Sequence, residues 1–167
     1  MTDFREPNIF KIKTYTKKSY SELLKRKKSQ QPYNQFLLMQ YSFIQYSVLL
    51  WETRDQYFEL IEKFFNREIH FFDFCSESEK MGEILDEICK KLEDNFVILS
   101  PLEKAVDFCD LIEEIYDLCE SMDPDSQLVF TDNNETDPAR KFEPSAEFQE
   151  ELKTLYHKAK NFAEMNS

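Results

Sequence analysis

The sequence predicts an all-α fold: an acidic bundle of about four antiparallel helices with a basic N-terminal extension. The chain has one glycine in 167 residues, and glycine is the residue that tight β-turns most need. Hydrophobic residues make up 41% of the chain, and many recur at the three- and four-residue intervals of amphipathic helices. A chain of this length fits one hydrophobic core.

Charge is divided unevenly along the chain. Residues 1–30 hold nine basic and three acidic side chains, a balance of +6, whereas the rest holds 12 basic and 30 acidic side chains, a balance of −18. An acidic body repels nucleic acid and anionic membranes, and it attracts basic surfaces. We therefore expect a basic protein surface as the partner, and no nucleic acid bound through the acidic body.

Residues 1–34 are predicted to form a basic arm. A short helix is expected at Ser19 to Lys28, because Ser19 and Glu22 have the spacing of a capping box. The arm is either a solvated leader or an anchor for a partner, and both interpretations remain open. Its candidate docking residues are Lys17, Lys18, Lys25, Arg26, Lys27 and Lys28.

Residues 35–52 form an aromatic-rich segment. From Phe36 to Trp51 the apolar residues cover nearly every face of a helix, and their β-branched and aromatic content would also suit a buried strand. We expect a helix, because the lack of glycine leaves no obvious hairpin partner. At 16 residues the stretch is shorter than the roughly 20 that cross a bilayer, so no membrane span is predicted.

The helical bundle is predicted over residues 53–167. Its first helix covers residues 53–65, with Thr53 and Gln56 at the spacing of a capping box. A short link then leads to the second helix, over residues 71–93. Both segments carry apolar residues on one face, so each needs a neighbouring helix to bury that face.

The second half of the bundle begins at a strong helix signal. Ser100 is the expected N-cap of the third helix, followed by Pro101 in the first turn and Glu103 at the capping-box position. A mobile loop is predicted at about 124–143, where polar residues predominate. The last helix is expected to follow Ser145 as its N-cap.

No catalytic residue, metal site or cofactor is predicted, and we expect that the protein is not an enzyme. The chain lacks the paired Glu-x-x-His motifs that a metal site inside a bundle uses. The four cysteines form no C-x-x-C pair and match no zinc module. We interpret them as buried free thiols, which indicates the cytoplasm or another reducing compartment. The interior of an organelle whose own genome encodes the protein is included.

Acidic residues supply the candidate partner-binding surface. Along the helix after Ser100 they recur in steps of three and four, which places most of them on one side. Their mutual repulsion costs a few tenths of a kcal/mol per pair. The face is therefore either an ordinary solvated surface or one retained for a basic partner. The candidate residues are Asp107, Asp110, Glu113, Glu114 and Asp117, supported by Glu83, Asp86 and Glu87.

Three stretches of the chain resemble the bacterial self-protective immunity proteins of the colicin D type. They are Tyr57 to Ile69, Phe71 to Phe74 and Asp110 to Cys119, and the resemblance covers about residues 55–165 through hydrophobic spacing and the placement of acids. It implies a small acidic four-helix bundle that plugs the positively charged tRNA-binding cleft of a nuclease toxin and blocks it.

Two functions remain open from the sequence. The first is a non-enzymatic binding module that blocks the RNA-binding cleft of a nuclease with an acidic helix face. The alternative is a structural or accessory subunit of a larger complex, organellar complexes included. In that case the basic arm and the aromatic segment at 36–51 would dock onto the neighbouring subunits.

Overall fold

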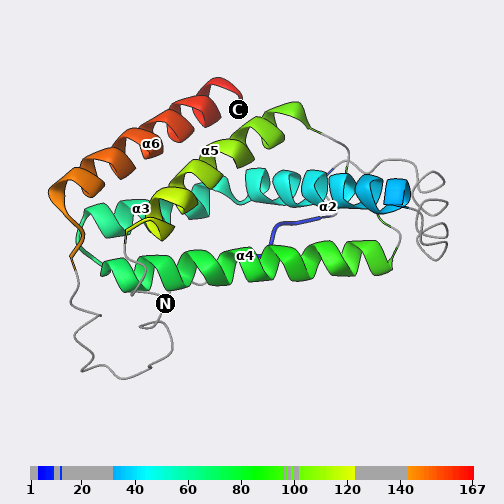
Figure 1. The fold of residues 1–167 in the computed structure, drawn as a ribbon, viewed down its shortest axis with the longest axis horizontal. Helices are drawn as coiled ribbons and strands as arrows, with labels where there is room; N and C mark the ends of the chain where they lie inside the picture. The colour runs from blue at the N-terminus through cyan, green and yellow to red at the C-terminus, as the bar shows by residue number, and fades with distance from the viewer. Residues whose placement is uncertain are drawn as a thin grey trace.

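The computed structural model describes residues 4–9, 12, 32–95, 97, 99, 102–122 and 143–167, and for residues 32–40 it describes the backbone alone. Five helices pack as a bundle, and these residues include no strand (Figure 1). The helices are α2 (Pro32–Glu52), α3 (Arg54–Phe65), α4 (Phe71–Asp94), α5 (Glu103–Glu120) and α6 (Ala146–Met165). The all-α prediction is confirmed, and the aromatic-rich segment adds a helix to the four expected.

Helix α2 lies at the centre of the bundle. It packs on both α4 and α5, and α6 packs on α5 (Figure 1). Val48, Leu49, Leu50 and Trp51 are each at most 3% exposed. The expectation of a helix over 36–51 is confirmed, and packing against several neighbours explains why its apolar residues cover so many faces.

The ring of Trp51 joins three helices. It makes edge-to-face contacts with Phe108 of α5 and Phe162 of α6, with ring centroids 5.4 and 6.4 Å away. The cationic groups of Arg54 and Lys104 lie over the same ring, 4.3 and 4.8 Å from its centroid. Aromatic contacts and cation–π contacts of this kind stabilise a fold beyond the area that they bury.

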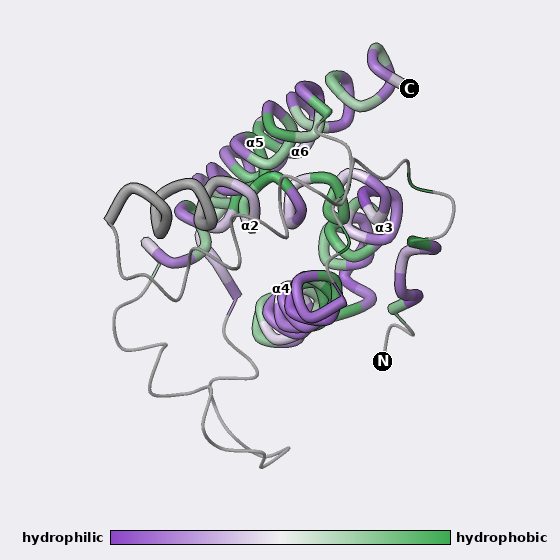
Figure 2. The backbone as a smooth tube through the Cα atoms, turned by 90° about the vertical axis from the view of Figure 1, so that its right-hand side faces the viewer, coloured by the Kyte–Doolittle hydropathy of each residue, from purple (hydrophilic) through white to green (hydrophobic). Residues whose placement is uncertain are grey.

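Along the surface helices, hydrophobic and hydrophilic residues alternate in short stretches, as in amphipathic helices (Figure 2). The predicted second helix is confirmed as α4, within one residue at its end. No helix in the described part of the chain combines the length and the apolar character needed to cross a bilayer.

The expected capping box at Thr53 is wrong, although α3 does begin directly after this residue. The Thr53 hydroxyl makes no cap bond to α3. It donates instead to the carbonyl oxygens of Leu49 and Leu50, at 3.0 and 3.2 Å. The last carbonyls of a helix have no partner within that helix, so a threonine at the α2–α3 corner stabilises the end of α2 rather than the start of α3.

The expected start of the third helix at Ser100 is also wrong, because α5 begins at Glu103 with Leu102 at the N-cap position. Leu99 is fully buried and Leu102 packs partly against the core. Burial of Leu99 takes precedence over the local helix-start signal, since a fully buried leucine contributes about 1.5–3 kcal/mol. Ser100 and Pro101 lie outside the described residues.

Ser145 is the N-cap of α6, as expected. Its hydroxyl oxygen accepts a hydrogen bond from the Phe148 backbone N–H at 3.2 Å. This bond satisfies one of the four backbone N–H groups that the first turn of a helix leaves unpaired.

Replacing Ser145 with alanine is expected to lower the free energy of unfolding by about 1 kcal/mol, because the cap bond is lost. Urea denaturation followed by circular dichroism measures the change. Thr154→Ala is the matched control on the same helix. The exposed Thr154 hydroxyl donates only to the Glu150 carbonyl of its own helix, so its loss should leave stability within about 0.5 kcal/mol. Equal losses for both variants would contradict the assignment of the cap.

The first described residues of the predicted arm lie against α3. The Arg5 backbone N–H donates to the Gln56 side-chain oxygen at 2.6 Å, and the Gln56 amide nitrogen donates to the Arg5 carbonyl at 2.8 Å. Phe4 and Ile9 pack partly against the core. Lys17, Lys18, Lys25, Arg26, Lys27 and Lys28 lie outside the described residues, as does the loop expected at 124–143 except for Glu143.

Candidate functional site

A groove opens between α4 and α5. Helix α4 packs on α2 and α3, whereas α5 packs on α2 and α6. A cavity of about 570 Å³ lies between the two helices, and a second cavity of about 400 Å³ shares Tyr46, Asp86 and Tyr116 with it. We call the two cavities together the α4–α5 groove.

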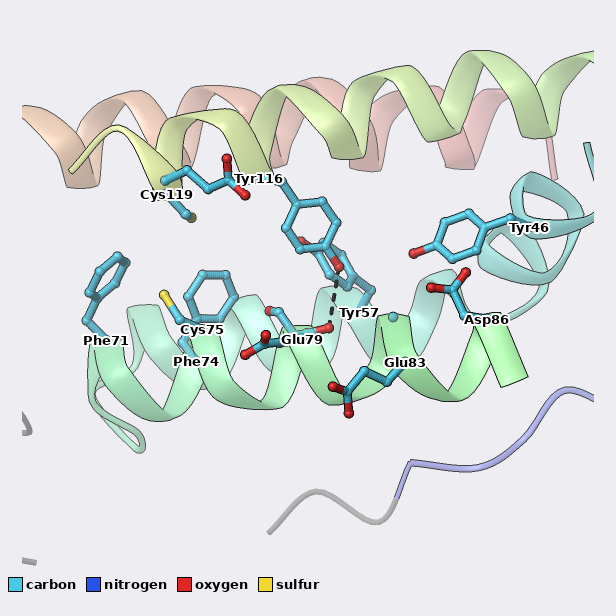
Figure 3. Close-up of a pocket in the computed structure, with 13 residues that line it drawn as sticks. Tyr46, Tyr57, Phe71, Phe74, Cys75, Glu79, Glu83, Asp86, Tyr116 and Cys119 are labelled. Carbon is cyan, nitrogen blue, oxygen red and sulfur yellow. Dashed lines mark hydrogen bonds between the residues drawn. The ribbon is translucent and has the colours of Figure 1, made fainter. Parts of the chain in front are cut away.

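Three tyrosines from three helices line the inner wall of the groove: Tyr46 of α2, Tyr57 of α3 and Tyr116 of α5 (Figure 3). The rings of Tyr57 and Tyr116 are tilted against each other, with centroids 5.9 Å apart. Burial raises the pKa of Tyr116 to about 12, and it raises the pKa of Tyr46 and of Tyr57 as well. The inner wall therefore presents neutral hydroxyls at physiological pH.

Two buried hydroxyls of the inner wall lie beside each other without a hydrogen bond of good geometry among the described residues. They are Tyr57 Oη and Ser78 Oγ, on side chains that are 1% and 4% exposed. Interactions of the Tyr57 hydroxyl with the hydroxyls of Tyr116 and Ser78 contribute to the shift in its pKa, and the Tyr116 hydroxyl donates to the Ser78 carbonyl at 3.5 Å. The three side chains therefore form a small hydroxyl cluster at the inner wall.

Acidic side chains lie along both edges of the groove, on α4 and on α5. On α4 the acids follow steps of four and three residues, which keeps them on one face, and Figure 3 shows them along the helix opposite Tyr116. Within the described part of the chain, no lysine, arginine or histidine lines either cavity. The exposed acids of this edge are Glu79, Glu83 and Asp86 of α4, and Glu113 and Glu120 of α5.

The eight acidic residues that the sequence singled out are all exposed. The structure brings three of them together at the groove: Glu83, Asp86 and Glu113. Glu114 is paired instead with Lys158 of α6, whose Nζ lies 2.8 Å from Glu114 Oε2. The remaining four lie on the surface outside the groove lining: Glu87, Asp107, Asp110 and Asp117.

The candidate residues from the sequence do not include the inner wall or two acids of the edge, Glu79 and Glu120. The helical spacing of Tyr57 and Tyr116 is that of core residues, and their rings are indeed largely enclosed. The available signal was the residue type: a tyrosine in a core stripe carries a hydroxyl that needs a partner, whereas a phenylalanine does not.

The four cysteines are unpaired, as expected for free thiols, with Cys89 and Cys109 buried and Cys75 and Cys119 partly buried. Cys75 and Cys119 face each other across one end of the groove (Figure 3). A hydrogen bond with Cys75, and then burial, raises the pKa of the Cys119 thiol. Burial raises the pKa of Cys109 to about 11. Thiols that stay protonated at neutral pH are weak nucleophiles.

Among the described residues, no group of three histidine, cysteine, aspartate or glutamate side chains is placed to hold a metal ion. The groove therefore offers neutral hydroxyls, aromatic faces and carboxylates. These groups together suit the binding of a positively charged group.

Comparison with models of known protein families, with curated proteins and with solved structures finds no match for this chain in any of the three.

Proposed function

We propose that the protein is a non-enzymatic binding module that attaches to a basic protein surface through the acids of α4 and α5. The observation that carries this proposal is the composition of the groove edge: carboxylates come from two helices, and none of the described residues that line the cavities is basic. Such an edge concentrates negative potential, which speeds the encounter with a basic partner and selects against acidic ones.

The partner class that fits best is a nuclease with a positively charged RNA-binding cleft, a tRNA-cleaving nuclease being the foremost candidate. Acids three and four residues apart on a helix lie about 5–6 Å from one another. A row of carboxylates at this interval presents a line of negative charge, as an RNA backbone does. The protein would occupy the cleft and exclude the RNA, in the manner that the resemblance to colicin D-type immunity proteins implies.

The alternative of a structural or accessory subunit, which would dock through the basic arm and residues 36–51, has weaker support from the second of these segments. Residues 48–51 fill the interior of the bundle, so they are not available to a neighbouring subunit while the bundle stays folded. The exposed acids around the groove are available without any rearrangement.

The experiment measures cleavage of tRNA by purified domains of tRNA-cleaving nuclease toxins in the presence of the protein. We expect at least one domain to be inhibited, with activity recovering as tRNA is added, because protein and RNA compete for the same cleft. The failure of every such domain to bind the protein would contradict the proposal.

Charge reversal on both sides of the groove is expected to slow association with the inhibited nuclease. The variant Glu83→Lys/Glu113→Lys should associate about tenfold more slowly at low salt, because steering by charge is lost. The control Glu151→Lys/Glu164→Lys makes the same change in net charge at exposed positions of α6. Stopped-flow fluorescence measures both rates, and equal slowing of the two variants would show that net charge alone matters.

A further inference from the structure

We propose that Cys75 of α4 and Cys119 of α5 form a reversible disulfide that joins the two walls of the groove, with hydrogen peroxide as the oxidant. The juxtaposition that carries this inference is a pair of thiols on opposite walls, which face each other across one end of the larger cavity (Figure 3). The bond would form in the free protein, so it does not depend on the partner proposed above.

The two thiols are already in contact. A hydrogen bond links them, and both side chains are partly buried where they line the same cavity. Only a short approach separates two hydrogen-bonded thiols from the roughly 2.05 Å of a disulfide bond. Helix α4 packs on α2 and α3, and α5 packs on α2 and α6, so the bond would add a direct link between two walls that share α2 as their support.

Cys75 is the thiol that begins the reaction. The pKa of Cys119 is raised, first by its hydrogen bond with Cys75 and then by burial, so Cys119 keeps its proton. The deprotonated Cys75 sulfur attacks one oxygen of hydrogen peroxide: an S–O bond forms, the O–O bond breaks, and hydroxide leaves and takes up a proton. The Cys119 sulfur then gives up its proton and attacks the Cys75 sulfur, which forms the S–S bond and releases water. The two thiols together lose two electrons and two protons, and one peroxide becomes two water molecules.

The charge at this end of the groove favours a neutral oxidant. The exposed carboxylates of Glu79 and Glu120 line the same cavity, and Glu120 also contributes to the raised pKa of Cys119. These carboxylates repel an anionic oxidant such as glutathione disulfide, whereas they do not repel hydrogen peroxide. The cavity of about 570 Å³ easily admits a molecule little larger than water, which occupies roughly 30 Å³ in the liquid.

The other two cysteines are not arranged for this reaction. Cys89 and Cys109 line the second cavity, but they are only 6% and 1% exposed. The Cys109 thiol is hydrogen-bonded to Ser47 of α2. Burial raises the pKa of Cys89 to about 12, so this thiol also keeps its proton. We therefore expect both to stay reduced while Cys75 and Cys119 react.

The test exposes the full chain to hydrogen peroxide for about an hour, a usual time for disulfide formation. The remaining thiols are blocked as the protein is unfolded, and it is then cut at its acidic residues, which lie between all four cysteines. We expect the free thiols to fall from four to two, and mass spectrometry to find one peptide pair joined through Cys75 and Cys119. Dithiothreitol should restore all four thiols. No loss of thiols, a bond between other cysteines or a bond between two copies of the chain would overturn the inference.

Three variants and the melting temperature complete the test. Cys75→Ser and Cys119→Ser should form no bond within the chain, whereas the control Cys89→Ala, which removes a thiol of α4 outside the pair, should form it as the unaltered protein does. Circular dichroism should show that the bond raises the melting temperature by about 5–10 °C, because it constrains the unfolded chain. A lower melting temperature of the oxidised protein would show that the bond does not fit the fold, and would also overturn the inference.

Discussion

Replacing Trp51 with alanine is expected to lower the free energy of unfolding by about 3–5 kcal/mol, the usual cost of removing a large aromatic side chain from a core. Trp51 is 3% exposed and contacts Phe108 of α5 and Phe162 of α6. The substitution would therefore leave a cavity where three helices meet. It would also remove the ring over which Arg54 and Lys104 lie.

The measurement is urea denaturation followed by circular dichroism, because Trp51 is the single tryptophan of the chain and the variant loses its fluorescence signal. Phe43→Ala is the matched control on the same helix. Phe43 is 38% exposed, so its loss should cost less than about 1.5 kcal/mol. If Trp51→Ala costs no more than Phe43→Ala, the segment at 35–52 is a removable appendage rather than part of the core.

Replacing Gln45 with methionine is expected to raise the free energy of unfolding by about 1–3 kcal/mol. Gln45 is fully buried, and neither its amide nitrogen nor its amide oxygen has a hydrogen-bond partner among the described residues. Methionine has a similar length and flexibility but no polar amide to bury. The folded protein therefore no longer carries the free-energy cost of removing an unpaired amide from water.

Gln56→Met is the control for this prediction, because it makes the same substitution where the amide is bonded. The Gln56 side chain both accepts from and donates to the backbone of Arg5. Its replacement should lower stability by about 0.5–1.5 kcal/mol for each bond lost. Chemical denaturation of both variants gives the comparison, and a loss of stability in Gln45→Met would show that its amide has a partner in the folded protein.

The helices could be predicted from sequence where local interactions decide the structure. The Ser145 cap depends on a side chain and a backbone N–H three residues apart, and both are visible in the sequence. The start of α5 could not be predicted in this way, because it depends on the burial of Leu99 and the packing of Leu102 against distant helices.

The candidate site could likewise be predicted from the sequence only where local patterns decide it. The sequence identifies Glu83, Asp86 and Glu113 as acids on helix surfaces, since their spacing places them opposite the apolar residues. These acids lie along the edges of one groove because α4 and α5 both pack on α2. No local pattern in the sequence contains that arrangement. The contacts among the hydroxyl groups of Tyr57, Ser78 and Tyr116 likewise depend on which side chains the fold brings near one another.

The most direct test of the account is a nuclear magnetic resonance titration of the full chain with a short oligoarginine peptide as a basic probe, in which backbone amide shifts are followed for each helix. The account predicts that the largest shifts fall on both walls of the groove, around Ser78 to Asp86 of α4 and Glu113 to Glu120 of α5. The exposed face of α6 should stay unchanged. Shifts centred on α6, or spread evenly over the acidic surface, would contradict it.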